Sequence, residues 1–196
     1  MIYDKTFYDG LKKCMDWQIT IGERIVDHYG FRSVIDFGCG NGYYLYGAFA
    51  RGALVKGYEY SYEQCKSYIN ELIRDRVSFA DLSLPIATDK KYDMAMSFEV
   101  AEHLPENKAD TFICNLVSAS DFIIFSAASV GQGGTDHINE QPQSYWISKF
   151  NQKGYSYSDD DSNILKSMFG NLIQKKMDEL GIVSPRFTYR QKKEKK

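Results

Sequence analysis

The sequence lacks the patterns that mark disulfide-rich, zinc-binding and membrane-spanning proteins. Its 196 residues contain four cysteines, with no Cys-x-x-Cys pair and no Cys/His cluster at zinc-finger spacing. No apolar run approaches the roughly 18 residues that span a bilayer, and residues 1–13 lack the basic start and apolar stretch of a secretory signal. We therefore expect reduced thiols, a cytoplasmic location and no membrane association.

An excess of basic charge is also missing. Lys and Arg number 24 against 26 Asp and Glu, for a net charge of −2, which excludes the strongly basic footprint of a dedicated nucleic-acid binder. Six basic residues and one acid fall within residues 186–196, so this tail carries +5 and residues 1–185 carry −7. The sequence predicts a single domain over residues 1–185, of ordinary length, and a solvated basic tail over residues 186–196.

Short apolar runs alternate with stretches of helical periodicity after an amphipathic N-terminal helix, predicted at residues 6–30. Such alternation predicts an α/β fold with a mostly parallel sheet and helices on both faces. The predicted strands are 33–37, 54–60, 77–80, 92–97 and 122–127, and the later helices are 43–51, 61–74, 105–118, 141–150 and 162–180. Residues 122–127 are the most apolar run, which indicates a strand buried on both faces.

A glycine-rich turn follows the first predicted strand. Gly38, Gly40 and Gly42 let the backbone turn tightly and approach a ligand closely. The third glycine departs from the spacing of a dinucleotide-binding turn, and no Gly-Lys-Ser/Thr follows, which argues against a phosphate-binding loop. Asp36 lies two residues before Gly38, and its carboxylate would repel a pyrophosphate and attract a cation. The turn therefore favours a positively charged ligand.

Two further acids lie at the ends of the next predicted strands. Glu59 follows Gly38 by 21 residues, the position from which an acid accepts hydrogen bonds from ribose hydroxyls in nucleotide-binding α/β sheets. Asp81 is placed to accept from an exocyclic adenine amine, with the backbone N–H of Leu82 available to a ring nitrogen. Together with Asp36, these acids indicate an elongated, cationic adenosine derivative.

The sequence here resembles the class I S-adenosylmethionine-dependent methyltransferases of the small-molecule type. The resemblance covers roughly residues 30–130, and residues 136–147 look like a segment that follows the fifth strand in small-molecule members. It implies a Rossmann-like three-layer sandwich and S-adenosylmethionine as cofactor, with Ser97 and Phe98 as additional cofactor-binding residues. The matching motifs are Val34–Gly42, Glu59, Ala80–Leu82 and Ser97–Leu104.

Members of this family usually close their sheet with antiparallel strands. Arg186–Arg190 is the candidate for the last of these strands here, and it is short and runs into the lysine-rich end. The sequence leaves open whether this strand is present, truncated or replaced.

Two of the three histidines are expected at the ligand-binding edge of the sheet. His103 follows the fourth strand and His137 lies in the loop after the fifth, whereas His28 belongs to the first helix. A histidine can accept a proton near neutral pH, so His137 and His103 are the predicted catalytic residues for an oxygen acceptor. Alternatively, His103 caps a helix and His137 fixes its own loop. A metal set of Asp136, His137 and Glu140 is less favoured, and no metal is predicted.

The acceptor is expected to be a small molecule, with oxygen as the first choice. The chain has Ser97-Phe98-Glu99 where an enzyme that methylates base amines would show an Asn/Asp-Pro-Pro-Tyr-like sequence, and no cysteine follows proline, as a cytosine-carbon enzyme needs. Two alternatives remain: a noncatalytic S-adenosylmethionine-binding subunit that requires a partner, and a nucleic-acid methyltransferase that uses the basic tail. The oligomeric state is left open.

Overall fold

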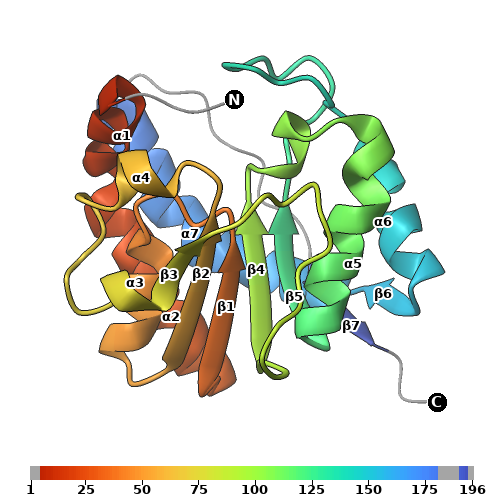
Figure 1. Ribbon diagram of the computed structural model, residues 1–196, viewed down its shortest axis with the longest axis horizontal. Coiled ribbons are helices and arrows are strands. Elements are labelled where there is room, and N and C mark those ends of the chain that lie inside the picture. Colours follow the sequence, from red (N-terminus) through yellow and green to blue (C-terminus); the bar gives the residue numbers. More distant parts are fainter. Residues whose placement is uncertain (1–4, 181–189, 194–196) are drawn as a thin grey trace. The chain divides into compact units, whose positions relative to one another are not determined.

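The computed structural model describes residues 5–180 and 190–193. The chain falls into two compact units, divided between Asp81 and Leu82, inside the domain predicted over residues 1–185 (Figure 1). Each unit combines parallel strands with helices, as the alternation of the sequence predicts. In the part of the chain that is described, no helix is both long enough and apolar enough to cross a membrane.

The first unit has three parallel strands in the order β3-β2-β1. Ser33 of β1 pairs with Leu54 of β2, and Gly57 of β2 pairs with Val77 of β3. The elements of this unit are α1 (Lys5–Leu11), η1 (Lys12–Cys14), α2 (Met15–Tyr29), β1 (Ser33–Phe37), α3 (Tyr43–Ala50), β2 (Leu54–Glu59), α4 (Tyr62–Cys65), η2 (Arg74–Arg76) and β3 (Val77–Phe79).

The N-terminal helix predicted at residues 6–30 is wrong as a single element. It is divided by η1 into α1 and α2, and α2 ends where predicted, at Gly30 with φ 68°. The carbonyl of Tyr8 accepts a hydrogen bond from Nδ2 of Asn41, at 3.1 Å. Because this contact to the glycine turn engages a carbonyl in the last turn of α1, the break is a tertiary effect that periodicity does not reveal.

The helix predicted over residues 61–74 is also wrong, since α4 covers only four residues. Ser61 makes no side-chain cap, and its backbone N–H donates instead to Oε1 of Glu59, at 2.9 Å. Further on, Oδ1 of Asn70 accepts from the N–H of Leu72, at 2.9 Å. Such a local side-chain turn competes with helical hydrogen bonding.

Helices α2 and α3 cross with their backbones in close contact. An added Cβ on Gly22 would lie 2.1 Å from the carbonyl oxygen of Tyr44, and one on Gly47 would lie 2.1 Å from that of Ile19. Both contacts involve backbone atoms, which a side-chain rotation cannot relieve. These two glycines therefore set the distance between the helices that support β1 and β2.

We expect Gly47→Ala to lower the free energy of unfolding by about 1–3 kcal/mol, because overpacking outweighs the higher helix propensity of alanine. Urea denaturation followed by circular dichroism measures this change. Gly170→Ala is the matched control, because Gly170 is helical and exposed and its Cβ would meet nothing within 4 Å. Equal stability of Gly47→Ala and the wild type would contradict the close-contact model.

The second unit has its strands in the order β4-β5-β7-β6. Strands β4 and β5 are parallel, and β7 is antiparallel to both of its neighbours. All five residues of β5 are buried, as predicted. The elements are β4 (Met94–Phe98), η3 (Ala101–His103), η4 (Glu106–Lys108), α5 (Ala109–Ala119), β5 (Phe122–Ser126), α6 (Gln143–Gln152), β6 (Tyr155–Tyr157), α7 (Asp159–Leu180) and β7 (Arg190–Lys193).

Residues 190–193 of the predicted basic tail form strand β7, which shares only Arg190 with the candidate last strand Arg186–Arg190. Phe122 of β5 pairs with Lys192, and Tyr155 of β6 pairs with Lys193. Residues 186–189 and 194–196, which belong to the same predicted tail, lie outside the described residues. Backbone partners on both sides explain how a lysine-rich segment enters a sheet, since ladder hydrogen bonds need no apolar side chain.

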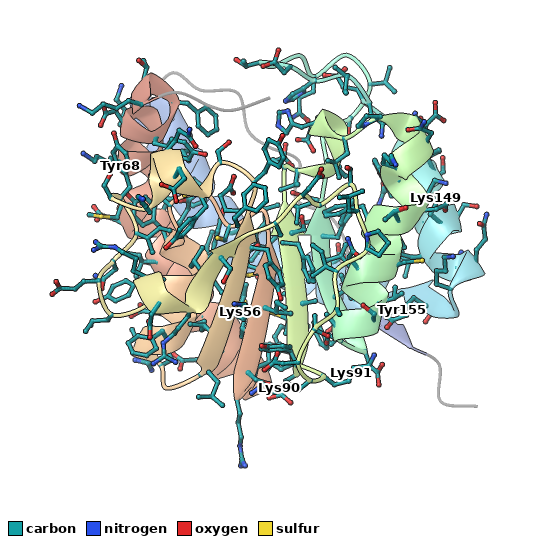
Figure 2. The ribbon with its side chains drawn as sticks, viewed as in Figure 1. Lys56, Tyr68, Lys90, Lys91, Lys149 and Tyr155 are labelled. Atoms are coloured by element: carbon teal, nitrogen blue, oxygen red, sulfur yellow. The ribbon has the colours of Figure 1, made fainter. Side chains whose placement is uncertain are left out.

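The end of α5 is joined to β6 by a tyrosine that lies next to the C-terminal strand. The hydroxyl of Tyr155 donates to the carbonyls of Ser120, at 2.6 Å, and Val117, at 3.0 Å (Figure 2). Its ring is buried, and burial raises its pKa above the usual range. This contact secures the part of the second unit that lies beyond β5.

Candidate functional site

The glycine turn of the first unit has the backbone conformation that its sequence predicts. Gly38, Gly40 and Gly42 have φ values of 91°, 52° and 70°, all in the left-handed region that favours glycine. The N–H groups of Gly38 and Cys39 donate to the carbonyl of Tyr58, at 2.8 and 3.1 Å. The turn therefore connects β1 to α3 while it remains attached to the end of β2.

Glu59 orders the turn from the end of β2. Its Oε2 accepts from the N–H of Gly40 and its Oε1 from the N–H of Ser61, both at 2.9 Å. Burial raises the pKa of Glu59, although hydrogen bonds from the backbone N–H groups of Ser61, Gly40 and Tyr60 oppose that shift. Each carboxylate oxygen keeps a second lone pair, so this side chain can still accept a hydrogen bond from a ligand hydroxyl.

Asp36 is the buried acid of β1. Its side chain is 2% exposed, and its Oδ1 has no hydrogen-bond partner among the described residues. Burial raises the pKa of Asp36 well above its usual range, and the nearby Glu59 raises it further. A cationic ligand would pair with this carboxylate and offset the cost of burying it.

We expect Asp36→Asn to stabilise the ligand-free protein more at pH 8 than at pH 4. A carboxyl whose pKa is raised on folding holds its proton more tightly in the folded state, so stability falls as pH rises above its unfolded pKa of ~3.9. Asparagine removes that loss. Thermal melting of both proteins at the two pH values measures the effect, with exposed Glu63→Gln as control. The same difference in melting temperature at both pH values would contradict it.

Helix α1 lies against the glycine turn within this unit, which the sequence analysis did not anticipate. Tyr8 is 1% exposed, and burial and then Glu59 raise its pKa. Tyr68, labelled in Figure 2, donates through its hydroxyl to Oδ1 of Asp9, at 3.0 Å, and its ring packs against Tyr8. Tyr8 therefore lies beside the glycine turn. The pattern of strand ends and loops in the sequence does not predict this position.

The predicted adenine contacts lie on either side of the boundary between the units. Asp81 is half-buried and belongs to the first unit, whereas Leu82 is buried and belongs to the second. The carbonyl of Leu82 accepts from Nδ2 of Asn115, at 3.3 Å. The assignment of Asp81 and Leu82 to adenine stays a prediction.

The end of β4 brings another acid into the second unit's site. Ser97 is fully buried and Phe98 is half-buried, and the next residue, Glu99, has φ 54°, which is uncommon for a non-glycine residue. Its carboxylate accepts from Oγ of Ser126, at 2.7 Å, and Nε2 of Gln132, at 2.9 Å. These bonds hold the strand end against the loop that follows β5.

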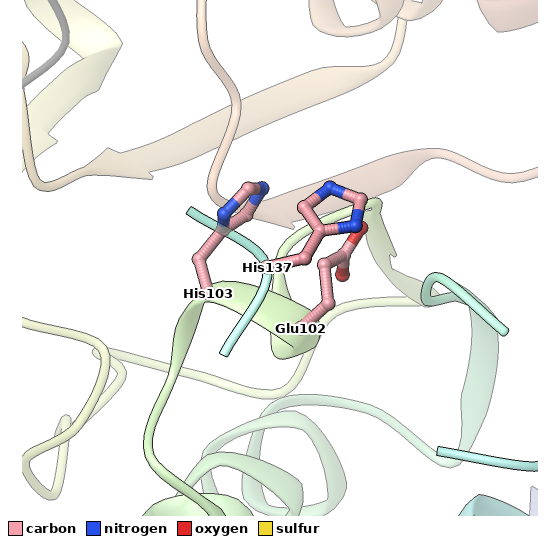
Figure 3. Close-up of side chains that lie close together, drawn as sticks. All are labelled: Glu102, His103 and His137. Carbon is pink, nitrogen blue, oxygen red and sulfur yellow. The ribbon is translucent and has the colours of Figure 1, made fainter. Parts of the chain in front are cut away.

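The two predicted histidines lie side by side in this unit (Figure 3). The ring centroids of His103 and His137 are 4.9 Å apart, with an interplanar angle of 78°. Glu102 joins them, and one ligand atom from each of the three side chains lies within 4.8 Å of the others. The sequence analysis missed Glu102, although its place beside His103 was the available signal. Asp136 and Glu140, which were weighed with His137 as a metal set, do not belong to this group.

Both rings are held by groups of the loop after β5. Nδ1 of His137 lies 3.0 Å from Oε1 of Glu140, whose carboxylate also accepts from the N–H groups of Gly131 and Gly133, at 2.7 Å each. Nδ1 of His103 lies 3.3 Å from the carbonyl oxygen of Asp136. The orientations of both imidazoles are therefore set by hydrogen bonds rather than by packing alone.

The backbone of Glu102 anchors the same loop. Its carbonyl accepts from the N–H groups of Ile138 and Asn139, at 2.9 and 3.0 Å. Burial, followed by the proximity of Glu99, raises the pKa of the Glu102 carboxyl to about 8. Burial likewise lowers the pKa of His103, while the hydrogen bond from His137 lowers that of Glu140. The group thus combines a buried acid with two oriented imidazoles.

Cys39 does not belong to the chemistry of the glycine turn. It is 6% exposed, and burial raises the pKa of its thiol well above the usual range, with Asp36 and Glu59 adding to the shift. A thiolate nucleophile needs the opposite shift. Cys39 therefore fills space between two glycines, as its sequence context predicts.

Comparisons with known proteins support the fold and the reaction class. Residues 35–117 match the model of a methyltransferase domain. DesVI of Streptomyces venezuelae superimposes with a TM-score of 0.64 at 11% identity, covering 81% of this chain and 93% of its own. The methyltransferase domain of bacterial CtHen1 gives 0.55 at 24%, covering 72% and 87%. A search among curated proteins finds no match.

A third solved structure was determined with a cofactor product. Magnesium protoporphyrin IX methyltransferase from Synechocystis PCC 6803, with bound SAH, gives a TM-score of 0.55 at 22% identity, covering 72% of this chain and 74% of its own. At such identities the likeness shows the fold, which confirms the predicted Rossmann-like α/β class. The methyltransferase-domain match over residues 35–117 and the glycine turn between β1 and α3 agree with this fold, and they support S-adenosylmethionine-dependent methyl transfer as the reaction class.

Proposed function

We propose that this enzyme transfers a methyl group from S-adenosylmethionine to a hydroxyl oxygen of a small molecule. The observation that carries the proposal is the pair of oriented imidazoles, His103 and His137, beside the end of β4. Methyl transfer to a hydroxyl is faster when a nearby group accepts the hydroxyl proton or forms a hydrogen bond with it. An imidazole is suited to this role near neutral pH. The Synechocystis neighbour is a methyltransferase of magnesium protoporphyrin IX, a small molecule, and this likeness supports a small acceptor.

The first unit supplies residues that fit the cofactor. When bound, S-adenosylmethionine supplies a methyl group on a positively charged sulfur. The buried carboxylate of Asp36, with its unpartnered Oδ1, suits the positive end of such a ligand. Glu59 suits the ribose hydroxyls, and the glycine turn allows close approach of the backbone. Asp81 of the same unit is a further candidate for this ligand on the family resemblance. The cofactor-binding roles of Leu82, Ser97 and Phe98, in the second unit, stay predictions from that resemblance.

The second unit supplies residues that fit the acceptor. With the Nδ1 of His137 held by Glu140, the lone pair is placed on Nε2. That lone pair would accept the proton of the acceptor's hydroxyl group, while S-adenosylmethionine would supply the methyl group to its oxygen. Positioning and exclusion of water account for much of the remaining rate enhancement.

Two measurements test the proposal. Isothermal titration should show that the purified chain binds S-adenosylmethionine and binds NAD weakly or not at all. Incubation with labelled S-adenosylmethionine and fractionated small-molecule extract should then yield a labelled product that resists the mild alkali that cleaves methyl esters, as an ether does. Tight NAD binding without S-adenosylmethionine binding would refute the cofactor assignment, and a labelled amine or thioether product would refute the oxygen acceptor.

A further inference from the structure

The group formed by Glu102, His103 and His137 has a feature that proton transfer alone does not require. Glu102 is 0% exposed, and its carboxyl lies near the N–H of Ala128 and the carboxyl of Glu99, but neither of its oxygens makes a hydrogen bond of good geometry. A buried carboxyl without a well-formed hydrogen bond costs several kcal/mol in an apolar interior. Buried charges in proteins are usually paired or bound to metals, and among the described residues this one lies next to two imidazoles (Figure 3).

We propose that Glu102, His103 and His137 form a binding site for one divalent transition-metal ion. One carboxylate and two imidazoles are a donor set that suits first-row ions such as Mn²⁺, Co²⁺ and Zn²⁺ better than Mg²⁺ or Ca²⁺, which prefer oxygen ligands throughout. This site revises the prediction of no metal and replaces the less favoured set of Asp136, His137 and Glu140.

The separations are close to those of a loaded site. Three ligand atoms bound to one ion at ~2.0–2.2 Å lie about 3–3.8 Å from one another, and the three ligand atoms here lie within 4.8 Å of one another. Side-chain movements of about an ångström would therefore bring them onto one ion. The ligands come from η3 and from the loop after β5. Hydrogen bonds from the N–H groups of Ile138 and Asn139 to the carbonyl of Glu102 already join these two segments.

The groups behind the histidines also match a metal site. Metal-binding imidazoles usually donate their second N–H to a carboxylate or a backbone carbonyl, which fixes the ring and its tautomer. His137 has the Glu140 carboxylate at 3.0 Å, and His103 has the Asp136 carbonyl at 3.3 Å. Asp136 presents that carbonyl from a backbone with φ 60°, an uncommon conformation outside glycine.

The ion would change how the acceptor is activated. This consequence rests on the proposed O-methyl transfer, whereas the metal site itself does not. Three protein ligands leave positions for other donors, and a hydroxyl that coordinates there loses its proton more readily. The proton then leaves to water, because the lone pair of His137 is held by the ion. The acceptor class becomes a hydroxyl compound whose oxygen can coordinate a divalent ion.

The native chain allows a direct test because it contains only three histidines. We expect substoichiometric Mn²⁺ to broaden the imidazole proton NMR signals of His103 and His137 and to leave that of exposed His28 sharp. The three signals are assigned with His28→Asn, His103→Asn and His137→Asn. Broadening of none of the signals, or of all three equally, would overturn the site.

Affinity measurements on variants give a second, independent readout. After removal of metal with EDTA, titration with Mn²⁺ should show one ion per chain, with binding at least about tenfold weaker in Glu102→Gln, His103→Asn and His137→Asn. The exposed residues give matched controls, Glu106→Gln and His28→Asn, which should bind as the wild type does. Tighter binding of Mg²⁺ than of Mn²⁺ would contradict the donor-set argument.

S-adenosylmethionine binding separates this inference from the proposed function. A chain that binds S-adenosylmethionine and no Mn²⁺ would refute the metal site and leave the cofactor assignment intact. Mn²⁺ bound at these residues, without binding of S-adenosylmethionine, would support the metal site and refute the proposed function. Retained binding of S-adenosylmethionine in the three ligand variants would also show that they are folded.

Discussion

His137→Ala is expected to lower the rate of methyl transfer about 100-fold or more, while affinity for S-adenosylmethionine stays within about twofold. Loss of a positioned proton acceptor typically costs about 10²–10⁴ in rate, and loss of a metal ligand disables the same step. The acids proposed to bind the cofactor, Asp36 and Glu59, belong to the other compact unit. Single-turnover kinetics with labelled S-adenosylmethionine and titration of the cofactor give the two quantities separately.

The control for this experiment is His28→Ala, because His28 lies exposed in α2. It should retain both the rate and the affinity of the wild type. A normal rate in His137→Ala would remove this histidine from the reaction. An equal loss of rate and affinity would instead indicate that His137 has a structural role.

Glu59→Ala is expected to weaken binding of S-adenosylmethionine at least about 30-fold, or about 2 kcal/mol. Hydrogen bonds to charged groups contribute about 1.5–3 kcal/mol each, and this carboxylate is proposed to accept from the ribose. The variant also loses the hydrogen bonds from the N–H groups of Gly40 and Ser61, so the glycine turn is held less firmly. Binding of S-adenosylhomocysteine should fall by a similar factor, since both ligands carry the same ribose.

Isothermal titration at one pH measures both affinities, and Glu63→Ala is the matched control. Glu63 is an exposed glutamate four residues along the chain, paired with Lys66. The Glu63→Ala variant should bind S-adenosylmethionine and S-adenosylhomocysteine as tightly as the wild type does. If Glu59→Ala binds either ligand as the wild type does, the assignment of Glu59 to the ribose is wrong.

Most strands and the glycine turn could be predicted because local patterns specify them. The strand of residues 122–127 is an apolar run, and its observed counterpart, Phe122–Ser126, is buried throughout. Gly38, Gly40 and Gly42 adopt positive φ values that other residues rarely reach. In each case a residue type is tied to one backbone conformation or to burial, whatever the distant parts of the chain do.

The elements that were predicted wrongly depend on distant partners. The N-terminal helix is interrupted where Tyr8 meets Asn41, 33 positions away. The charge of residues 190–193 can be seen in the sequence and predicted a solvated tail. Their pairing with β5 and β6 depends on distant segments and cannot be seen there. The helix expected over residues 61–74 ends at Cys65, and beyond it the hydroxyl of Tyr68 donates to Asp9, 59 positions away.

The candidate site shows the same division. Chemistry and position along the chain were enough to select Asp36, Glu59, His103 and His137, because parallel strands deliver their carboxyl ends to one edge and acids and histidines there suit a cationic nucleoside and an oxygen acceptor. The partners of these residues were not evident: Glu102 close to the two imidazoles, Glu140 behind His137, and Tyr8 beside the turn.

The sequence alone determined the α/β class of the fold and the position of a glycine turn between the first strand and the helix that follows it. Only the tertiary structure decided that Glu102 lies buried against two histidines from separate segments, and that a lysine-rich segment completes the strands beside β5. The physical reason is that burial and desolvation arise when distant segments pack together. A carboxylate acquires its partners, and the energetic need for a cation, from neighbours that its own stretch of sequence does not contain.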